Sequence, residues 1–353
     1  MRIGYSWWGF LADEKMKNGK LISSPDGNAT YSWTIIHELQ KRGHEVYQMM
    51  PDRDYEYVTG TGYSAFKSFC QQDRYEAYRD LIRTNTIHMP DLDLLLHEWR
   101  MPIFGRNTPS ARFRPDFQPD YDRQWELLGH YRGKCPVIGF DLDYQMTDSD
   151  EMIFDRVLDL GHKPGFNRVH TEIPFDFMHM DDFKVVSPYN RIAYIGNRYA
   201  RDEAIEKYLA PISHDIGIHL YGNWLEGGRN SLEKWPAFHY YPRVTSSDFR
   251  NIYCHSSITP LLAKEEYCTY GFMTARIWEC LFFGTLPVGM AEFDGIERYL
   301  PDELIVNSAD ELLEVAKRAN TDWLWRHQMI MQLRDDLEFM DVRNFVTHLL
   351  DLA

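Results

Sequence analysis

The sequence has few cysteines and no excess of basic residues, and both shortages exclude classes of protein. Its five cysteines are odd in number and scattered without a CxxC pair, so neither a disulfide framework nor a thiolate zinc site is indicated. A reducing cytoplasm fits this pattern best. The 38 lysines and arginines are outnumbered by 53 aspartates and glutamates, which leaves a net charge of −15. Most of the surface should therefore repel nucleic acids and anionic membranes, and a polyanionic partner would require a local basic patch.

Long apolar stretches and targeting signals are missing as well. No run is long enough to span a bilayer, so no membrane partner is expected. The first residues, MRIGYSWWGF, lack the basic lead and the small-residue cleavage site of an export signal, and they are predicted to form a strand. There is no internal repeat and no low-complexity segment.

The sequence does contain an alternation of short apolar runs with helical patterns over its 353 residues. In the first half RIGYSWW, HEVYQMM, DLDLLLHE and CPVIGFDLD are strand-like, and helices are predicted over about 29–42 and 121–131. In the second half the strand-like runs are RIAYIGN, IGIHLYGN, SSITPLLA, GTLPVGM and ELIVN. Such alternation is typical of α/β domains with parallel sheets and helical crossovers.

Two such domains are predicted from this pattern. The first covers residues 1–165 and the second covers 191–334. Residues 166–190, which mix Pro, Gly and isolated aromatics without a clear period, are predicted to be a linker. The last helical residues, 335–353, are expected to cross back onto the first domain.

Two helix boundaries carry specific signals. Ser308 and Glu311 have the spacing of a capping box, which predicts the start of a helix. The long helical pattern from Asp322 to Leu352 is expected to break near Asp341.

The stretch MTARIWECLFFGTLPVG, residues 273–289, contains two charges within an apolar helical run. Arg276 and Glu279 lie three positions apart, so they share one face of the helix. A carboxylate such as Glu279 can accept both hydroxyls of a ribose, and Arg276 can neutralise a phosphate or hold that carboxylate. The alternative is an internal Arg–Glu pair with a purely structural role.

Neighbouring turns carry further groups suited to a phosphate. Ligands of parallel α/β sheets bind where strands end and helices begin, because free N–H groups there attract anions. The turn YIGNRYARDE offers a glycine for close backbone approach and arginines that could clamp a diphosphate. The candidates are Gly196, Asn197, Arg198 and Arg201 in this turn, Gly222 and Asn223 in LYGNW, and Tyr270 in CTYGFM.

The segments IAYIGNRYARDE, IHLYGN, TARIWE and ELIVNSADELLEVAKRA resemble, in the same order and at similar spacing, the bacteriophage DNA β-glucosyltransferases, which are GT-B glycosyltransferases. The resemblance is clearest in the second half. It implies two Rossmann-like domains whose parallel sheets face a central cleft, the first binding the acceptor and the second the nucleotide sugar. It also implies that Arg198 and Arg201 hold the pyrophosphate of a UDP-sugar, that Arg276 supports it, and that Glu279 grips the ribose.

The resemblance further implies a catalytic carboxylate directly after a buried strand. CPVIGFDLDYQ offers Asp141 and Asp143, and Asp143 ranks first because it lies further into the loop. Such an aspartate would be a general base that deprotonates an acceptor hydroxyl, which attacks the anomeric carbon with inversion. The same DLD matches the metal-binding DxD of GT-A glycosyltransferases, but the nucleotide loops of the second half have no place in that fold. No metal ligand is therefore predicted; a divalent metal is possible but is not required by the sequence.

Two segments are candidates for acceptor binding. Asp26, Gly27 and Asn28 lie between the first strand and its helix, where a plain turn with a helix cap is the alternative. Residues 97–118, HEWRMPIFGRNTPSARFRPDFQ, place arginines among aromatic residues, so that phosphates and the gap left by an extruded base could both be contacted. These arginines are Arg100, Arg106, Arg112 and Arg114. An ordinary surface loop is the alternative.

The family resemblance thus implies a cytoplasmic, monomeric hexosyltransferase, acting in the host cell if phage-encoded. Its donor would be a UDP-sugar, with UDP-glucose expected, and its acceptor a hydroxylated pyrimidine such as a 5-hydroxymethyl base in double-stranded phage DNA. The net charge of −15 argues against duplex DNA, because counterion release at many phosphates usually supplies the affinity. Two alternatives therefore stay open, a GT-B enzyme with a small-molecule or glycan acceptor and a nucleotide-binding module without transfer activity.

Overall fold

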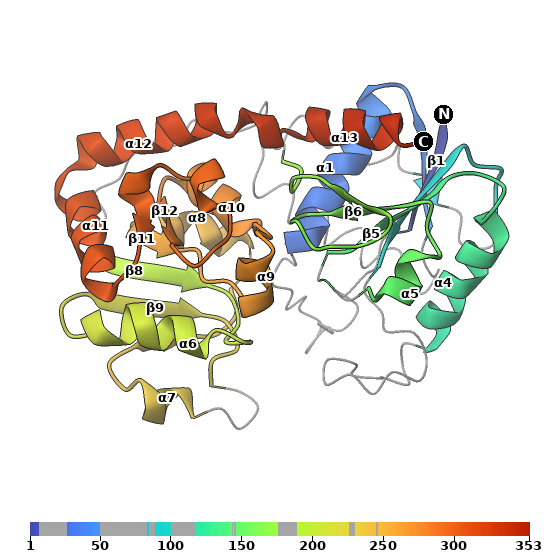
Figure 1. The fold of residues 1–353 in the computed structure, drawn as a ribbon. Helices are drawn as coiled ribbons and strands as arrows, with labels where there is room; N and C mark the ends of the chain where they lie inside the picture. The colour runs from blue at the N-terminus through green and yellow to red at the C-terminus, as the bar shows by residue number, and fades with distance from the viewer. Residues whose placement is uncertain are drawn as a thin grey trace. The chain divides into compact units, whose positions relative to one another are not determined.

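The protein divides into two compact units in a computed structural model (Figure 1). The first unit comprises Met1–Asp176 and Met340–Ala353, and the second unit comprises Phe177–Phe339. The structure describes residues 1–6, 27–49, 83–84, 89–99, 118–142, 144, 146–175, 189–225, 230–244 and 246–353.

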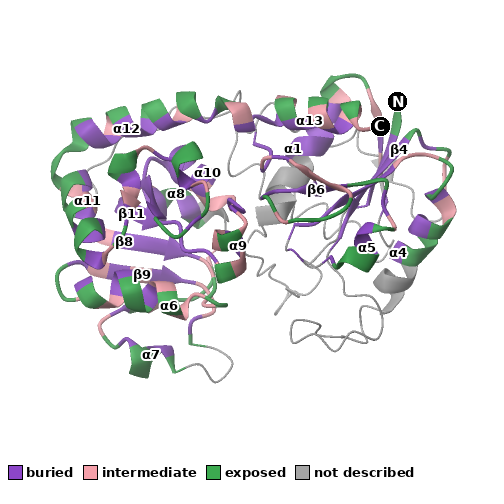
Figure 2. Cartoon of the chain, in the orientation of Figure 1, coloured by how far each residue is buried: buried purple, intermediate pink, exposed green. Residues whose placement is uncertain are grey.

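The first unit is built on a parallel sheet of seven strands in the order β3-β2-β1-β4-β5-β6-β7. The strands are β1 (Arg2–Ser6), β2 (Glu45–Gln48), β3 (Arg83–Thr84), β4 (Leu94–Glu98), β5 (Val137–Phe140), β6 (Arg156–Asp159) and β7 (Arg168–His170). The helices of this unit are α1 (Gly27–Lys41), α4 (Gln118–Tyr131), α5 (Asp148–Glu151) and α13 (Val342–Asp351). Every residue of β4 and β5 is buried, and β5 is accordingly a continuous apolar run, whereas β4 ends with the buried polar residues His97 and Glu98 (Figure 2).

The returning end of the chain is tied into the first unit at two places. Helix α13 packs on α1, and the Arg42 guanidinium donates hydrogen bonds to the Arg343 carbonyl at 2.6 Å and the Thr347 hydroxyl at 2.8 Å. Near the end of the first segment of this unit, Phe175 donates its N–H to the Met340 carbonyl, and the Phe175 carbonyl accepts a hydrogen bond from the Val342 N–H. The outgoing and incoming segments are therefore hydrogen-bonded to each other.

The second unit has a parallel sheet of six strands in the order β10-β9-β8-β11-β12-β13. The strands are β8 (Tyr189–Ile195), β9 (Gly217–Tyr221), β10 (His239–Tyr241), β11 (Ser256–Pro260), β12 (Leu286–Met290) and β13 (Ile305–Val306). The helices are α6 (Asp202–Ala204), α7 (Ser231–Lys234), α8 (Ser246–Cys254), α9 (Glu265–Thr269), α10 (Arg276–Phe283), α11 (Ala309–Thr321) and α12 (Trp323–Asp336). Helix α6 continues as a π-helical turn over Ile205–Leu209.

Two sequence predictions about boundaries differ from the structure. Residues 168–170, which were assigned to the linker, form edge strand β7 of the first unit, and a strand of three residues has too few positions to show a period. The predicted capping box at Ser308 is altered, because Glu311 donates its N–H to the Ser308 hydroxyl but its carboxylate accepts from Asn307 rather than from Ser308. The helix nevertheless begins at Ala309, and the break near Asp341 separates α12 from α13.

Candidate active site

The strand order of the second unit reverses between β8 and β11, and the loops after β8 and β9 carry six of the nine predicted donor residues. Such a switch point leaves a crevice at the sheet edge, because consecutive crossovers leave in opposite directions. The residues that shape this edge are two glycines, two arginines and one buried tyrosine.

Gly196 and Gly222 let the loops after β8 and β9 approach each other closely. A Cβ atom added at Gly222, whose φ is 141°, would lie 2.3 Å from the Gly196 carbonyl oxygen. A Cβ at Gly196 would lie 2.7 Å from Nη2 of Arg276. The amide oxygen of Asn197 then joins the loops by accepting the Asn223 N–H at 3.0 Å. Neither glycine position has room for a side chain.

Arg276, the first residue of α10, reaches the end of β8 through the space left by Gly196. Its Nη2 donates to the Ile195 carbonyl at 2.6 Å, and its guanidinium carbon lies 4.3 Å from the centre of the Tyr194 ring. Tyr194 is fully buried, so it gives the guanidinium a rigid aromatic support. The arginine is thus held by a carbonyl and a ring rather than by an acid, and it keeps its full positive charge at the sheet edge.

Arg201 is a second, half-buried cation near Tyr194, with its guanidinium carbon 6.0 Å from the centre of the ring. Its Nε donates to the Leu262 carbonyl at 3.2 Å, and Nη1 donates to the Asn197 and Tyr199 carbonyls at 3.2 and 2.7 Å. Since Leu262 follows β11, this side chain bridges the switch point between β8 and β11. Arg201, like Arg276, has no carboxylate partner among the contacts of the described chain.

Arg198, in contrast, is neutralised. Its Nε donates to Asp202 at 2.8 Å, and Nη2 forms a second, shorter contact with the same carboxylate. Nη1 donates to the Ser231 hydroxyl at 3.0 Å, and the guanidinium lies over the Trp235 ring. The hydrogen bond to Asp202 raises the pKa of Arg198. Arg198 therefore ties the loop after β8 to α7, whereas Arg201 and Arg276 share Tyr194.

Glu279 and Arg276 are both described, and each makes its hydrogen bond to another residue rather than to its helix neighbour, although their charges influence each other's pKa. Oε2 of Glu279 accepts a hydrogen bond from the buried Tyr253 hydroxyl at 3.0 Å. Burial raises the pKa of Glu279, while the charge of Arg276 and the Tyr253 hydrogen bond oppose that rise. Its second oxygen, Oε1, takes no part in this hydrogen bond.

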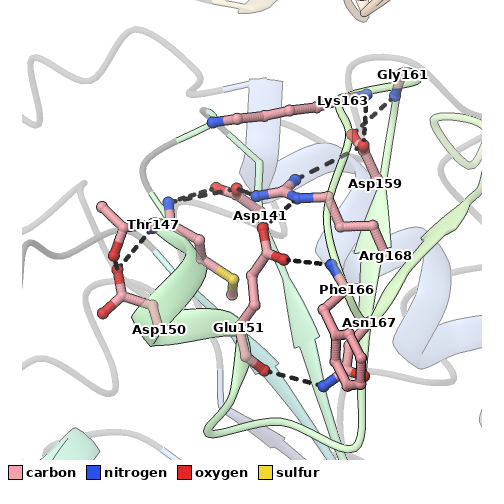
Figure 3. Close-up of polar contacts among 11 residues, drawn as sticks. Asp141, Thr147, Asp150, Glu151, Asp159, Gly161, Lys163, Phe166, Asn167 and Arg168 are labelled. Atoms are coloured by element: carbon pink, nitrogen blue, oxygen red, sulfur yellow. Dashed lines mark hydrogen bonds and ion pairs between the residues drawn. The ribbon is translucent and has the colours of Figure 1, made fainter.

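In the first unit, Asp141 follows β5 and lies in a buried group of acids around Arg168 (Figure 3). Its Oδ2 accepts from Nη2 of Arg168 at 2.7 Å, and both oxygens are 3.3–3.4 Å from the Met146 N–H. Arg168 also contacts Glu151 and Asp159. Asp141 is fully buried, so it is a fixed, charge-paired carboxylate at the carboxyl end of the sheet.

The remaining sequence candidates divide into described and undescribed positions. Gly27 and Asn28 open helix α1, and Tyr270 directly follows α9. The other candidates lie outside the described residues: Asp26, Arg100, Arg106, Arg112, Arg114 and Asp143.

Three residues that hold these groups were missed from the sequence. Tyr194 and Tyr253 belong to a buried strand and an amphipathic helix, where a tyrosine reads as core. Arg168 was assigned to the linker, because nothing in the neighbouring sequence indicates that this arginine has a buried acidic partner. In the described part of the chain no three His, Cys, Asp or Glu side chains form a group suited to a metal ion, and no helix there is long and apolar enough to cross a membrane.

No protein-family model and no curated protein matches this sequence. Solved structures do share its fold. A structure of T4 phage β-glucosyltransferase is 12% identical, with a TM-score of 0.64 over 100% of this chain and 99% of that one. Anabaena HepE in complex with UDP-glucose is 11% identical, with a TM-score of 0.57 over the whole of both chains. An O-GlcNAc transferase mutant from Thermobaculum terrenum is 13% identical, with a TM-score of 0.59 over 99% of this chain and 66% of that one. These likenesses confirm the predicted two-domain α/β fold of GT-B type.

Proposed function

We propose that this chain is a glycosyltransferase that takes its sugar from a UDP-sugar, with UDP-glucose as the expected donor. The observation that carries the proposal is the pair Arg201 and Arg276, two cations near Tyr194 at the switch point of the sheet that have no acidic hydrogen-bond partner among the described residues. A diphosphate is the ligand that such a pair, beside a glycine-lined loop, is best suited to bind. Structures with the same fold include complexes described as containing UDP-glucose or UDP.

Within this proposal each residue of the second unit has a separate task. Arg201 and Arg276 stabilise the negative charge that develops on the leaving diphosphate, and Gly196 and Gly222 admit the phosphates close to the backbone. Glu279 accepts hydrogen bonds from the ribose hydroxyls, with Tyr253 fixing its orientation. Asn197, Asn223 and Tyr270 line the same donor site. Arg198 shapes the loop without contacting the phosphates.

The transfer step requires a base near the acceptor, and we assign it to the aspartates after β5, Asp141 or Asp143. The carboxylate removes the proton of an acceptor hydroxyl as its oxygen forms a bond to the anomeric carbon. The bond from that carbon to the diphosphate oxygen breaks at the same time, and UDP leaves with the electron pair. Attack from the face opposite UDP inverts the anomeric configuration.

For the acceptor we propose a hydroxylated pyrimidine, such as a 5-hydroxymethyl base, in double-stranded phage DNA. One structure with this fold is described as the DNA-modifying enzyme β-glucosyltransferase. The acceptor contacts are assigned to Arg100, Arg106, Arg112 and Arg114, with Asp26, Gly27 and Asn28 beside the sugar. The net charge of −15 favours a second candidate, a small-molecule or glycan acceptor, because an acidic surface repels duplex DNA.

The test is to incubate the protein with UDP-glucose and duplex DNA that contains hydroxymethylated or plain pyrimidines. The DNA is then digested to nucleosides and analysed by mass spectrometry. A hexose on the hydroxymethylated nucleoside alone is the expected result. Release of UDP with small hydroxylated acceptors but no labelled nucleoside would favour the second candidate, and no release with any acceptor would refute transferase activity.

The two aspartates are separated by Asp141→Asn and Asp143→Asn variants in the same assay. The variant that lacks the base should lose about 10²–10⁴-fold in turnover while UDP binding is retained. If both variants transfer sugar as well as the parent, the base lies elsewhere.

A further inference from the structure

Among the described residues of the first unit, Arg168 contacts three buried carboxylates. Its Nη2 lies 2.7 Å from Oδ2 of Asp141, its Nε lies 2.5 Å from Oε1 of Glu151, and its Nη1 lies 3.7 Å from Oδ2 of Asp159. All four side chains are at most 3% exposed. The acids come from the end of β5, from α5 and from the end of β6, so a strand-edge arginine joins three elements at one point (Figure 3).

From this geometry we infer that Arg168 is a positioning residue that holds Asp141 ionised and in place, and that Glu151 and Asp159 limit its effect by competing for the same cation. The inference deepens the proposed function, and it rests on Asp141 being the transfer base. Nothing in the sequence pattern of the donor or acceptor loops requires such an arginine.

The competition follows from the sharing of one guanidinium by three acids, which also contact backbone N–H groups. Glu151 also accepts the Phe166 N–H at 3.2 Å, and Asp159 accepts the Gly161 and Lys163 N–H groups at 3.1 and 3.0 Å. Asp141 has a longer backbone contact, 3.3–3.4 Å to the Met146 N–H. A buried carboxylate depends on a nearby cation, because burial disfavours its charged form.

Other charged and titratable groups around Asp141 do not replace Arg168 as the cation that pairs with it. On the neighbouring strand β4, Glu98 accepts a hydrogen bond from Tyr5. At the start of α13, Asp341 pairs with Arg343. Tyr144, in the loop after β5, has its pKa raised mainly by burial and then by Asp159, so it stays neutral. Lys163 lies over the Tyr144 ring, 5.3 Å from its centre.

A structural salt bridge and a positioning residue predict different responses to substitution. If Arg168 sets the ionisation of Asp141, removing the cation and removing a competing anion must have opposite effects. Arg168→Gln should move the acid limb of the kcat/KM profile upward by about 1–3 pH units, the usual influence of one adjacent arginine on a carboxylate. Glu151→Gln retains an oxygen acceptor for Arg168 and removes one anion, so it should move the limb downward.

The experiment measures the pH profile of sugar transfer for the wild type, these two variants and a control, Arg156→Gln, which removes an exposed arginine that donates to the neighbouring Asp155 carbonyl. The control should leave the acid limb unchanged. Opposite shifts for Arg168→Gln and Glu151→Gln support the inference. Shifts in the same direction, or none in a folded Arg168→Gln variant, overturn it. If that variant does not fold, the direction of the Glu151→Gln shift decides.

A second measurement does not require transfer activity. The carboxyl carbon of Asp141 is assigned by comparison with Asp141→Asn in protein labelled with ¹³C-aspartate, and its titration is followed by NMR. The same opposite shifts are expected there. If the wild type transfers no sugar but these shifts occur, the proposed function fails while the electrostatic role of Arg168 stands. If sugar is transferred and the Asp141 signal does not respond to Arg168→Gln, the inference alone fails.

Discussion

Gly222→Ala tests whether the loops after β8 and β9 are built as one unit. The added Cβ atom would lie 2.3 Å from the Gly196 carbonyl oxygen and 3.1 Å from Oδ1 of Asn197. The first of these neighbours is backbone, so relief requires the two loops to separate. Separation would stretch the hydrogen bond between Asn197 and Asn223 and move the edge where Arg276 reaches the Ile195 carbonyl.

The expected loss of stability has two parts. An alanine at a φ of 141° costs about 1–3 kcal/mol because an L side chain is strained there. Overpacking against the Gly196 carbonyl adds about 1–3 kcal/mol. The sum is roughly 2–6 kcal/mol, a large part of the 5–15 kcal/mol that typically stabilises a domain.

The matched control is Gly295→Ala in the same unit. Gly295 also has a positive φ, 70°, but no atom lies within 4 Å of its added Cβ. This variant should therefore lose only the strain, about 1–2 kcal/mol. Urea unfolding gives the free energy of unfolding of each variant, and calorimetric titration with UDP gives the affinity of the donor site.

The expected outcome is that Gly222→Ala is less stable than the control and binds UDP at least tenfold more weakly. A Gly222→Ala variant with the stability of Gly295→Ala and the UDP affinity of the wild type would refute the reasoning. In that case the close approach of the two glycines has no part in the donor site.

Three further predictions follow from single side chains. Glu279→Gln should raise the KM for the donor at least tenfold, since a charged hydrogen bond contributes about 1.5–3 kcal/mol. Burial raises the pKa of Glu279, so the free energy of unfolding of the wild type should fall as pH rises above 4.5. Urea unfolding should therefore show the variant gaining stability relative to the wild type between pH 4 and 7. Arg201→Ala should slow turnover about a hundredfold, whereas Arg198→Ala should mainly lower the melting temperature, and equal kinetic losses would contradict their different contacts. Burial lowers the pKa of His97 to about 4, so the stability that its neutral ring contributes is complete above pH 6.5 and lost towards pH 4; urea unfolding should show the wild type losing roughly 3 kcal/mol relative to His97→Gln over that range.

Strands such as β5 and β12 were predictable because burial on both faces leaves a continuous apolar run. The glycines of the donor site were predictable too, since a glycine directly after a buried strand signals a close backbone approach. Strands β3, β6, β7 and β10 were not predicted from the sequence. Strands β3, β7 and β10 have only two or three residues each, and β6 begins and ends with a charged residue.

The different roles of Arg198 and Arg201 could not be read from the sequence. Both lie in one turn, and only the folded chain places Asp202, Ser231 and Trp235 around the first and carbonyl groups around the second. Arg168 is a similar case, because its partner Asp141 is 27 residues away in the chain. Such pairings depend on the order of strands in the sheet, which sequence periodicity does not specify.

The first unit is formed by two segments that flank the second unit in the sequence, so the two units are completed in a fixed order during translation. Residues 177–339 are complete before α13 is made, so the second unit can fold during translation while the first still lacks its last helix. Until α13 is synthesised, the surface of α1 that it covers stays uncovered, and the hydrogen bonds between Phe175 and the returning chain cannot form. Proteins commonly acquire structure from the amino terminus onward during synthesis. Here the half that is translated first is the half that finishes last, and a ribosome that stalls in the final helix would release a chain with only one complete domain.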